Sequence, residues 1–299
     1  MELGIALPTA GPLASPAAIV RVAREAESLG YDAVWTFERL LRPIADMTHP
    51  DGRTGPLPDE YRVVYEPMET LSYVAAVTDR IRLGTSVVDA LLHPPVVLAR
   101  RFATLDQLSH GRAIAGLGQG WMPQEFETAG VPMSRLGAGM DDTVAALRAC
   151  WGPDPVAYEG RDHRIAPSEI NPKPVQAHLP IIMGAMTPAG IRRAARIADG
   201  FNPIAIDAET LRGMVAAFRT AATERGRDPS GLTVVVRVNG PLTREPMADR
   251  PYLSGSPAQI VEDLAALDGV DHVFFSTRGS ADLDEAVGLM GELITQARV

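Results

Sequence analysis

Short apolar runs and amphipathic segments alternate along the chain. The first apolar run, residues 3–8, predicts a buried strand, and residues 15–29 that follow show the periodicity of a helix. Ser15 can cap this helix, Pro16 suits its first turn, and Gly30 suits its end. The chain therefore opens with a strand that is followed by a helix.

The same pattern recurs to the end of the chain. Strands are expected at residues 3–8, 33–37, 81–88, 113–117, 180–184, 201–206, 232–238 and 272–276. Helices are expected at residues 15–29, 66–78, 94–108, 137–151, 188–198, 208–225, 257–267 and 283–297. Eight strand–helix units predict a (β/α)₈ TIM barrel formed by one domain over residues 1–299, with insertions after strands 2, 4 and 7. A doubly wound sheet is the alternative, and the number of units favours the barrel.

Two segments interrupt this regular order. Residues 40–64 are rich in Pro, Gly and Asp and have no period, so we expect a long loop there. Loops of that length in compact domains are usually functional, and a lid over the site is one such function. Residues 152–179 are irregular, with a hairpin expected at residues 156–165 that turns at Gly160.

Composition and charge narrow the possible partners and location. One cysteine, Cys150, excludes a disulfide framework and favours a reducing cytoplasm, where it is expected to be a core residue. The net charge is −9 and no basic cluster occurs, which argues against nucleic acid and anionic membranes as partners. A local site could still hold a small anion. We expect no signal peptide and no membrane-spanning segment.

The histidines do not predict a metal site. The chain has six, at positions 49, 93, 110, 163, 178 and 272, and none form a pair at metal-ligand spacing on one helix. His93 is the one that falls at a strand–helix exit, where a barrel binds its ligands, whereas His110 falls in a turn on the opposite face. We therefore do not expect a zinc enzyme.

A glycine-rich exit follows the fourth predicted strand, with the sequence Gly116-Leu-Gly-Gln-Gly-Trp121. A dinucleotide fingerprint would instead open a helix in the first βαβ unit, so a nicotinamide site is disfavoured. Glycines at a strand exit let a flat ring or another backbone approach closely, or simply serve a loop. Glu125 follows at the start of a helix, where it could contact substrate or cap that helix.

Two further strand ends carry candidate chemistry. After the fifth strand, Gly184 leads to Thr187, which can cap a helix beginning at Pro188; this helix start could bind phosphate or be ordinary capping. After the second strand, Glu38 could orient or exchange a proton and Arg39 could bind an anion. The alternative for Glu38 and Arg39 is an exposed surface pair.

Several segments together resemble the luciferase-like monooxygenase superfamily. The matching stretches are residues 31–35 (YDAVW), 78–85 (TDRIRLGT), 105–112 (LDQLSHGR), 116–121 (GLGQGW), 125–126, 130–132, 171–176 (NPKPVQ), 181–184 (IIMG) and 193–200 (RAARIADG). The loop after the second strand and Glu60-Tyr61-Arg62 are similar to the group described as probable F420-dependent oxidoreductases. The resemblance covers most of the chain and is specific in combination.

The resemblance implies a TIM barrel that binds a flavin or the deazaflavin coenzyme F420 at the carboxyl ends of its strands. It implies a non-proline cis peptide, Ser86–Val87, that backs the ring, and a phosphate loop at residues 184–187. Glu38, Arg39 and Glu125 are the candidate catalytic residues; family members commonly have histidine where Arg39 stands. The cofactor-binding residues so implied are Ser86, Val87, Gly116, Gly118, Met183, Gly184, Ala185, Met186 and Thr187.

These observations predict a cytoplasmic oxidoreductase that transfers hydride between F420 and a small organic substrate. The alternative is an FMN-dependent monooxygenase that works with a separate reductase. A third hypothesis is a non-catalytic barrel that binds a cofactor or serves as a partner subunit. The family's habit implies a homodimer. We expect the loop at residues 40–64 and the segment at residues 239–256 to determine which substrate fits.

Overall fold

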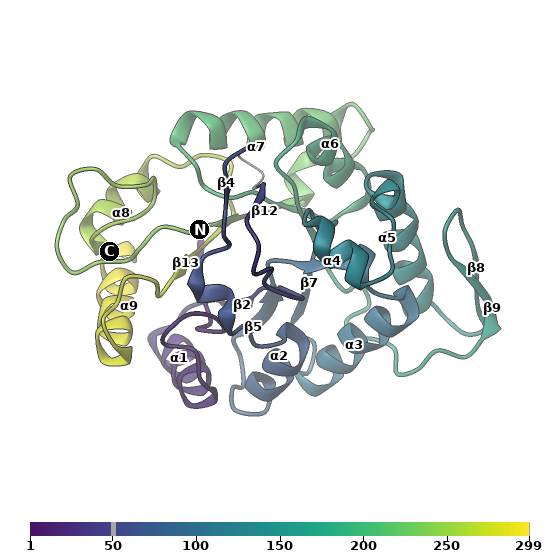
Figure 1. The fold of residues 1–299 in the computed structure, drawn as a ribbon, viewed down its shortest axis with the longest axis horizontal. Coiled ribbons are helices and arrows are strands. Elements are labelled where there is room, and N and C mark those ends of the chain that lie inside the picture. The colour runs from purple at the N-terminus through teal and green to yellow at the C-terminus, as the bar shows by residue number, and fades with distance from the viewer. Residues whose placement is uncertain (49–51, 299) are drawn as a thin grey trace.

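A closed barrel of eight parallel strands forms the centre of the molecule in a computed structural model, which describes residues 1–48 and 52–298 (Figure 1). Its strands are β1 (Glu2–Ala6), β2 (Ala33–Thr36), β5 (Arg82–Thr85), β7 (Ala113–Gly118), β10 (Ile181–Gly184), β11 (Gly200–Asn202), β12 (Thr233–Arg237) and β13 (His272–Ser276). Each strand pairs with its neighbour, and the pairing of β10 with β7 closes the circle. The predicted TIM barrel is confirmed.

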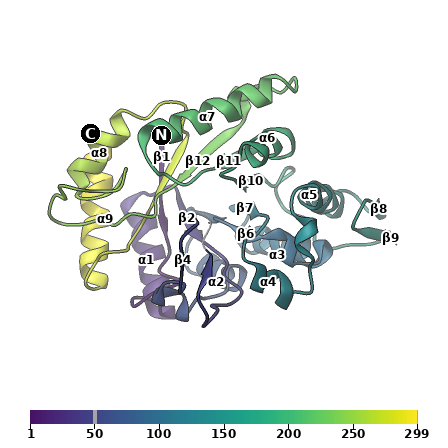
Figure 2. The ribbon, with the colours of Figure 1, turned by 45° about the horizontal axis from the view of Figure 1, so that its top comes forward.

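Helices surround the barrel on its outer side (Figure 2). They are α1 (Pro16–Leu29), α2 (Pro67–Ala75), α3 (Pro95–Leu108), α4 (Pro123–Thr128), α5 (Ala138–Trp151), α6 (Pro188–Ile197), α7 (Ala208–Thr223), α8 (Pro257–Ala265) and α9 (Leu283–Ala297). Short 3₁₀ helices add η1 (Asp59–Arg62), η2 (Ala90–Leu92), η3 (Met133–Arg135) and η4 (Pro229–Gly231). Ser15 caps α1, and Gly30 ends it with a left-handed φ of 87°.

Two apolar cores stabilise the barrel itself, and a third, small cluster of Met47, Leu57 and Met122 packs the insertion against the segment before α4. The larger one lies between the strands and the surrounding helices and includes Cys150, which is buried. The smaller one fills the inside of the barrel, where the rings of Trp35 and Phe274 stack with centroids 4.9 Å apart. Because these rings fill the interior, the barrel is a packed core, and space for a ligand is expected among the loops at the carboxyl ends of its strands.

The insertion at residues 40–64 is more ordered than the sequence predicts. Instead of one long loop, it contains the short paired strands β3 (Met47–Thr48) and β4 (Thr54–Gly55) and the 3₁₀ helix η1. Two-residue strands have no periodicity, which explains why the prediction missed them. The insertion is also tied to the loop after β1, since Gly11 N donates to Glu60 O at 3.0 Å. His49 lies outside the described residues.

The hairpin predicted at residues 156–165 is confirmed. It consists of β8 (Val156–Glu159) and β9 (Arg164–Ser168), and Gly160 N donates to His163 O in its turn. The hairpin projects from the barrel beside α5 (Figures 1 and 2). In the described part of the chain, no helix combines the length and the apolar character needed to cross a bilayer.

Candidate functional site

A backbone bulge interrupts the third barrel strand at its carboxyl end. β5 stops at Thr85, the short strand β6 (Val88–Asp89) resumes after two residues, and both pair with β7. The peptide bond between Ser86 and Val87 is cis, which confirms the prediction for this position. The backbone groups of the bulge find partners on other elements: Ser86 N donates to Thr36 O at 2.6 Å, and Glu38 N donates to Val87 O at 3.0 Å.

The glycines around this bulge are there because other parts of the chain approach them closely. A Cβ at Gly116 would lie 1.6 Å from the carbonyl oxygen of Thr85. A Cβ at Gly118 would lie 2.4 Å from Val87, and one at Gly184 would lie 3.1 Å from it. Of the reasons for glycine considered above, close approach of another backbone therefore applies to Gly116. The Val87 side chain occupies the space that Gly118 and Gly184 leave between β7 and β10.

One buried polar side chain, that of Asn202, holds the Ser86 side chain in place. The Ser86 hydroxyl donates to Asn202 Oδ1 at 2.6 Å, and Asn202 Nδ2 in turn donates to Val235 O, also at 2.6 Å. Asn202 is the last residue of β11, so the sequence signal was a polar residue at a strand exit. Its role was not predicted from the sequence.

The loop from β10 to α6 has the capping geometry expected from the sequence. Met183 is buried in β10, Gly184 and Ala185 are half-buried, and Met186 and Thr187 are exposed. Thr187 Oγ1 accepts from Gly190 N at 3.1 Å, and the first turn of α6 contains no acidic residue. An anion would be compatible with this helix start, while phosphate binding there stays a prediction.

Glu38 is buried and fully engaged with other parts of the protein. Its carboxylate accepts from Asp89 N at 2.7 Å and lies 2.7 Å from His93 Nε2. Burial lowers the pKa of His93, but the hydrogen bond to Glu38 and the negative charge of Glu38 together outweigh this effect, so that pKa lies above its usual value. The pair joins the exits of β2 and β5, and the interpretation of Glu38 as an exposed surface charge is wrong.

Arg39 and Glu125 form an ion pair at the start of the insertion that follows β2. Arg39 Nη1 lies 2.6 Å from Glu125 Oε2, and Glu125 Oε1 accepts from Leu40 N at 2.7 Å. The Arg39 guanidinium also lies 5.4 Å from the centroid of the Trp121 ring. Glu125 is fully buried, and this burial raises its pKa although Arg39 opposes the shift. Glu125 therefore holds the start of the insertion in place, a role that the sequence analysis did not foresee.

Asp89, at the end of β6, is a buried acid that the sequence analysis did not select. Burial raises the pKa of its carboxyl to about 7, with Arg39 opposing the shift and Glu38 and Glu125 adding to it. Its carboxylate lies beside Gly118, because a Cβ there would be 3.1 Å from Asp89 Oδ1. The sequence signal was an acidic residue that ends an apolar strand, Val87-Val88-Asp89.

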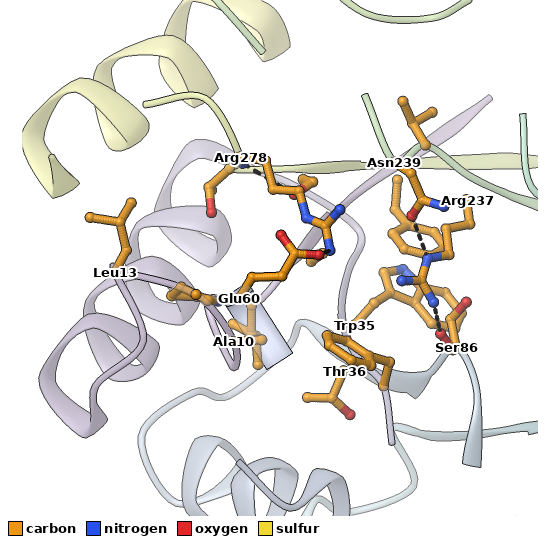
Figure 3. A pocket seen from close by; sticks show the side chains of 18 of the residues that line it. Ala10, Leu13, Trp35, Thr36, Glu60, Ser86, Arg237, Asn239 and Arg278 are labelled. Carbon is orange, nitrogen blue, oxygen red and sulfur yellow. Dashed lines mark hydrogen bonds and ion pairs between the residues drawn. The ribbon is translucent and has the colours of Figure 1, made fainter. Parts of the chain in front are cut away.

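A cavity of about 200 Å³ opens next to the bulge (Figure 3). The ends of β1, β2, β12 and β13 and the helix η1 form its walls, and Trp35 and Phe274 contribute from the barrel interior. Arg237 donates through Nη1 to the carbonyl of Ser86 and through Nε to Asn239 Oδ1 at 2.8 Å. Burial lowers the pKa of Arg237 to about 10, so the side chain stays cationic at neutral pH.

The predicted site residues therefore divide into separate groups. Ser86 lines the cavity, whereas Glu38, Arg39 and Glu125 lie outside its lining. Val87, Gly118 and Gly184 meet at the bulge. Arg237 was missed, although a charge directly after three valines at the end of a strand could have indicated it.

Comparison with known proteins identifies the family of this chain. Residues 1–243 match the family model described as luciferase-like monooxygenase. The chain belongs to the luciferase-like monooxygenase family. The proteins similar to this chain include an F420-dependent dehydrogenase and a pyrimidine monooxygenase, so the family holds both oxidoreductases and monooxygenases.

Three members or structural neighbours of the luciferase-like family illustrate this range. An uncharacterized protein of Mycobacterium tuberculosis is 34% identical over 281 residues, which cover 89% of this chain and 95% of that protein. An F420-dependent glucose-6-phosphate dehydrogenase of Kineococcus radiotolerans is 31% identical over 191 residues, or 62% of this chain and 52% of that enzyme. The crystal structure of a monooxygenase from Streptomyces bottropensis has a TM-score of 0.81 at 24% identity, covering 99% of this chain and 98% of that one.

Proposed function

We propose that this protein is an oxidoreductase that transfers hydride between coenzyme F420 and a small organic substrate. The observation that carries the proposal is the Ser86–Val87 bulge, which lies beside a cavity at the carboxyl ends of the strands. The similarity to an F420-dependent dehydrogenase supports the choice of cofactor. The alternative cofactor is FMN, which would suit a monooxygenase.

The residues around the bulge fit a flat ring with an anionic tail. Val87 fills the gap between Gly118 and Gly184, so the strand ends offer a closed surface at this point. The start of α6, with the amides of the preceding loop and no acid in its first turn, suits a phosphate. Ser86 and Val87 would back the ring, and residues 184–187 would hold the phosphate. When bound, the deazaflavin supplies two-electron hydride chemistry, and the protein supplies orientation.

Arg237, Glu38 and the Arg39–Glu125 pair would act by holding the bulge and the start of the insertion in place. Arg237 binds the Ser86 carbonyl, and Glu38 N binds the Val87 carbonyl, so both backbone oxygens of the bulge point to fixed donors. The Arg39–Glu125 pair fixes the chain where the insertion leaves β2. Held in this way, the bulge would keep the ring at one angle to the cavity, which favours reaction through orientation.

Titration with purified F420 tests the proposal. We expect saturable binding at tens of micromolar or below, measured by fluorescence or calorimetry, with weaker binding of FMN. If F420 does not bind in that range, the proposal is wrong. Oxygen consumption with reduced FMN and an organic substrate would instead favour the monooxygenase, because the deazaflavin lacks the nitrogen at which flavins form their oxygen adduct.

Gly118→Ala is expected to weaken F420 binding at least tenfold. The new Cβ would lie 2.4 Å from Val87 Cγ2 and would displace that side chain from its place in the bulge. Overpacking of this kind also costs about 1–3 kcal/mol of stability. Gly213→Ala is the control, since nothing lies within 4 Å of a Cβ at that helical position. Equal F420 affinity of the two variants would show that Val87 does not back the ring.

A further inference from the structure

The cavity beside the bulge has an excess of positive charge. Its lining residues include two arginines, Arg237 and Arg278, and a single carboxylate, Glu60. Glu60 is already paired with Arg278 at 2.6 Å (Figure 3). Two positive charges and one negative charge leave a net charge of +1 in the cavity, in a protein whose total charge is −9. The excess charge lies on Arg237.

Arg237 has two neutral partners and no anionic one. Its side chain donates hydrogen bonds to the Ser86 carbonyl and to the Asn239 side-chain oxygen. Within residues 1–48 and 52–298, no carboxylate forms an ion pair with its guanidinium, and Nη2 has no hydrogen-bond partner. A shielded guanidinium is stabilised strongly when it meets an anion, and its planar set of donors matches a carboxylate or phosphate.

The neighbours of Arg237 also fix how a ligand would lie. The Phe37 ring is 5.3 Å from the guanidinium carbon and restrains its plane. Leu7 and Leu13 add apolar wall to the same cavity. At about 200 Å³ the cavity is below the roughly 300–1,000 Å³ that is usual for small-molecule sites, so a ligand that fits it is small.

We propose that the substrate carries an oxyanion, a carboxylate or a phosphate, which binds Arg237 while its apolar part fills the cavity. This assignment of substrate class rests on the proposed function, in which the cavity receives the substrate. Because Arg237 also holds the Ser86 carbonyl, the bound anion lies directly beside the cofactor-backing segment. Arg237 is then the residue that selects anionic substrates.

Binding of small probe molecules tests whether the cavity requires an anionic ligand. Sodium butyrate, butyramide and inorganic phosphate would be titrated into the full-length protein by calorimetry, with sodium chloride holding the ionic strength constant. We expect butyrate or phosphate to bind at least tenfold more tightly than butyramide. The anion that binds with the higher affinity shows whether the substrate class is a carboxylate or a phosphate. Equal binding of butyrate and butyramide, with no binding of phosphate, would overturn the proposal.

Substitution at Asn239 tests whether Arg237 supplies the site. Asn239→Asp keeps the shape of the side chain but places a carboxylate on Arg237 Nε, where the amide oxygen now lies at 2.8 Å. We expect at least a tenfold loss of anion affinity in this variant and little change in the neutral Asn239→Ser variant. Asn239 is exposed, so both variants should fold. Equal affinity for the anion in the Asp and Ser variants would overturn the proposal.

Two comparisons complete the design. Arg237→Gln should lose anion binding, whereas Arg244→Gln, at an exposed arginine, should keep it. F420 titration of the same proteins separates the two proposals. If the wild type binds butyrate through Arg237 but does not bind F420, the proposed cofactor is wrong and the anion site stands. If Asn239→Asp weakens F420 binding and leaves butyrate binding unchanged, Arg237 serves the cofactor and the substrate assignment is wrong.

Discussion

Replacing Glu125 with alanine is expected to lower the free energy of unfolding by about 3–5 kcal/mol, the usual cost of breaking a buried ion pair from one side. Glu125 is fully buried and accepts from the Arg39 guanidinium and from Leu40 N. Without it, Arg39 keeps a charge that has lost its partner at 2.6 Å, and the Leu40 amide loses its acceptor. The loss should therefore be much larger than that of one ordinary hydrogen bond.

Urea denaturation followed by circular dichroism would measure this effect. Glu127→Ala is the matched control, because Glu127 lies on the same short helix but is exposed, and its loss should change stability by less than about 0.5 kcal/mol. Glu125→Gln keeps an acceptor for Leu40 N and should fall between the two. If the Glu125 and Glu127 alanine variants are equally stable, the ion pair does not hold the insertion.

The second large effect is a dependence of stability on pH that arises at Asp89. Its pKa is raised to about 7 in the folded protein, from an ordinary value of 3.8, because the carboxyl is buried. Between these two values the folded protein keeps a proton that the unfolded chain has released. Stability therefore falls as the pH rises from about 4 to about 7, by an amount on the order of 4 kcal/mol if the shift is complete.

Asp89→Asn should remove this loss. The asparagine variant cannot ionise, so its stability relative to the wild type should rise between pH 4 and 7 and then level off. Comparing the two proteins by denaturation at several pH values cancels groups they share, such as Glu66, whose pKa burial also raises to about 7. A difference that does not vary with pH would mean that the Asp89 carboxyl titrates normally.

The barrel could be predicted from the sequence because each barrel strand is an apolar run bounded by turn-forming or helix-capping residues. Residues 113–117 and 272–276, for example, were expected as strands and lie in β7 and β13. A strand that is buried against both the barrel interior and the helices must be apolar along its length, so an apolar run predicts such a strand. The paired strands β3 and β4 have two residues each, which is too short for any pattern to appear.

The site was harder to predict because its partners lie far apart in the chain. Arg39 and Glu125 were both selected, but 86 positions separate them and no local pattern links them as a pair. Arg237 and Ser86 are 151 positions apart. The cis bond was placed correctly only through the family resemblance, since Ser86 and Val87 by themselves carry no such signal. The ends of the strands predict where the site lies, whereas the side-chain contacts within it depend on tertiary packing.

The hydrogen bond from Arg237 to the Ser86 carbonyl has a consequence for how this enzyme could evolve. A mutation at position 237 that admits a neutral substrate also removes the donor that holds the bulge. If Arg237 binds the substrate and the bulge backs the cofactor, as proposed, selection for a new substrate and selection for the old bulge geometry act against each other at this one residue. Asn239 and Arg278 reach the same cavity without touching Ser86, so specificity can change there first, and Arg237 should be the slowest position of the cavity to vary.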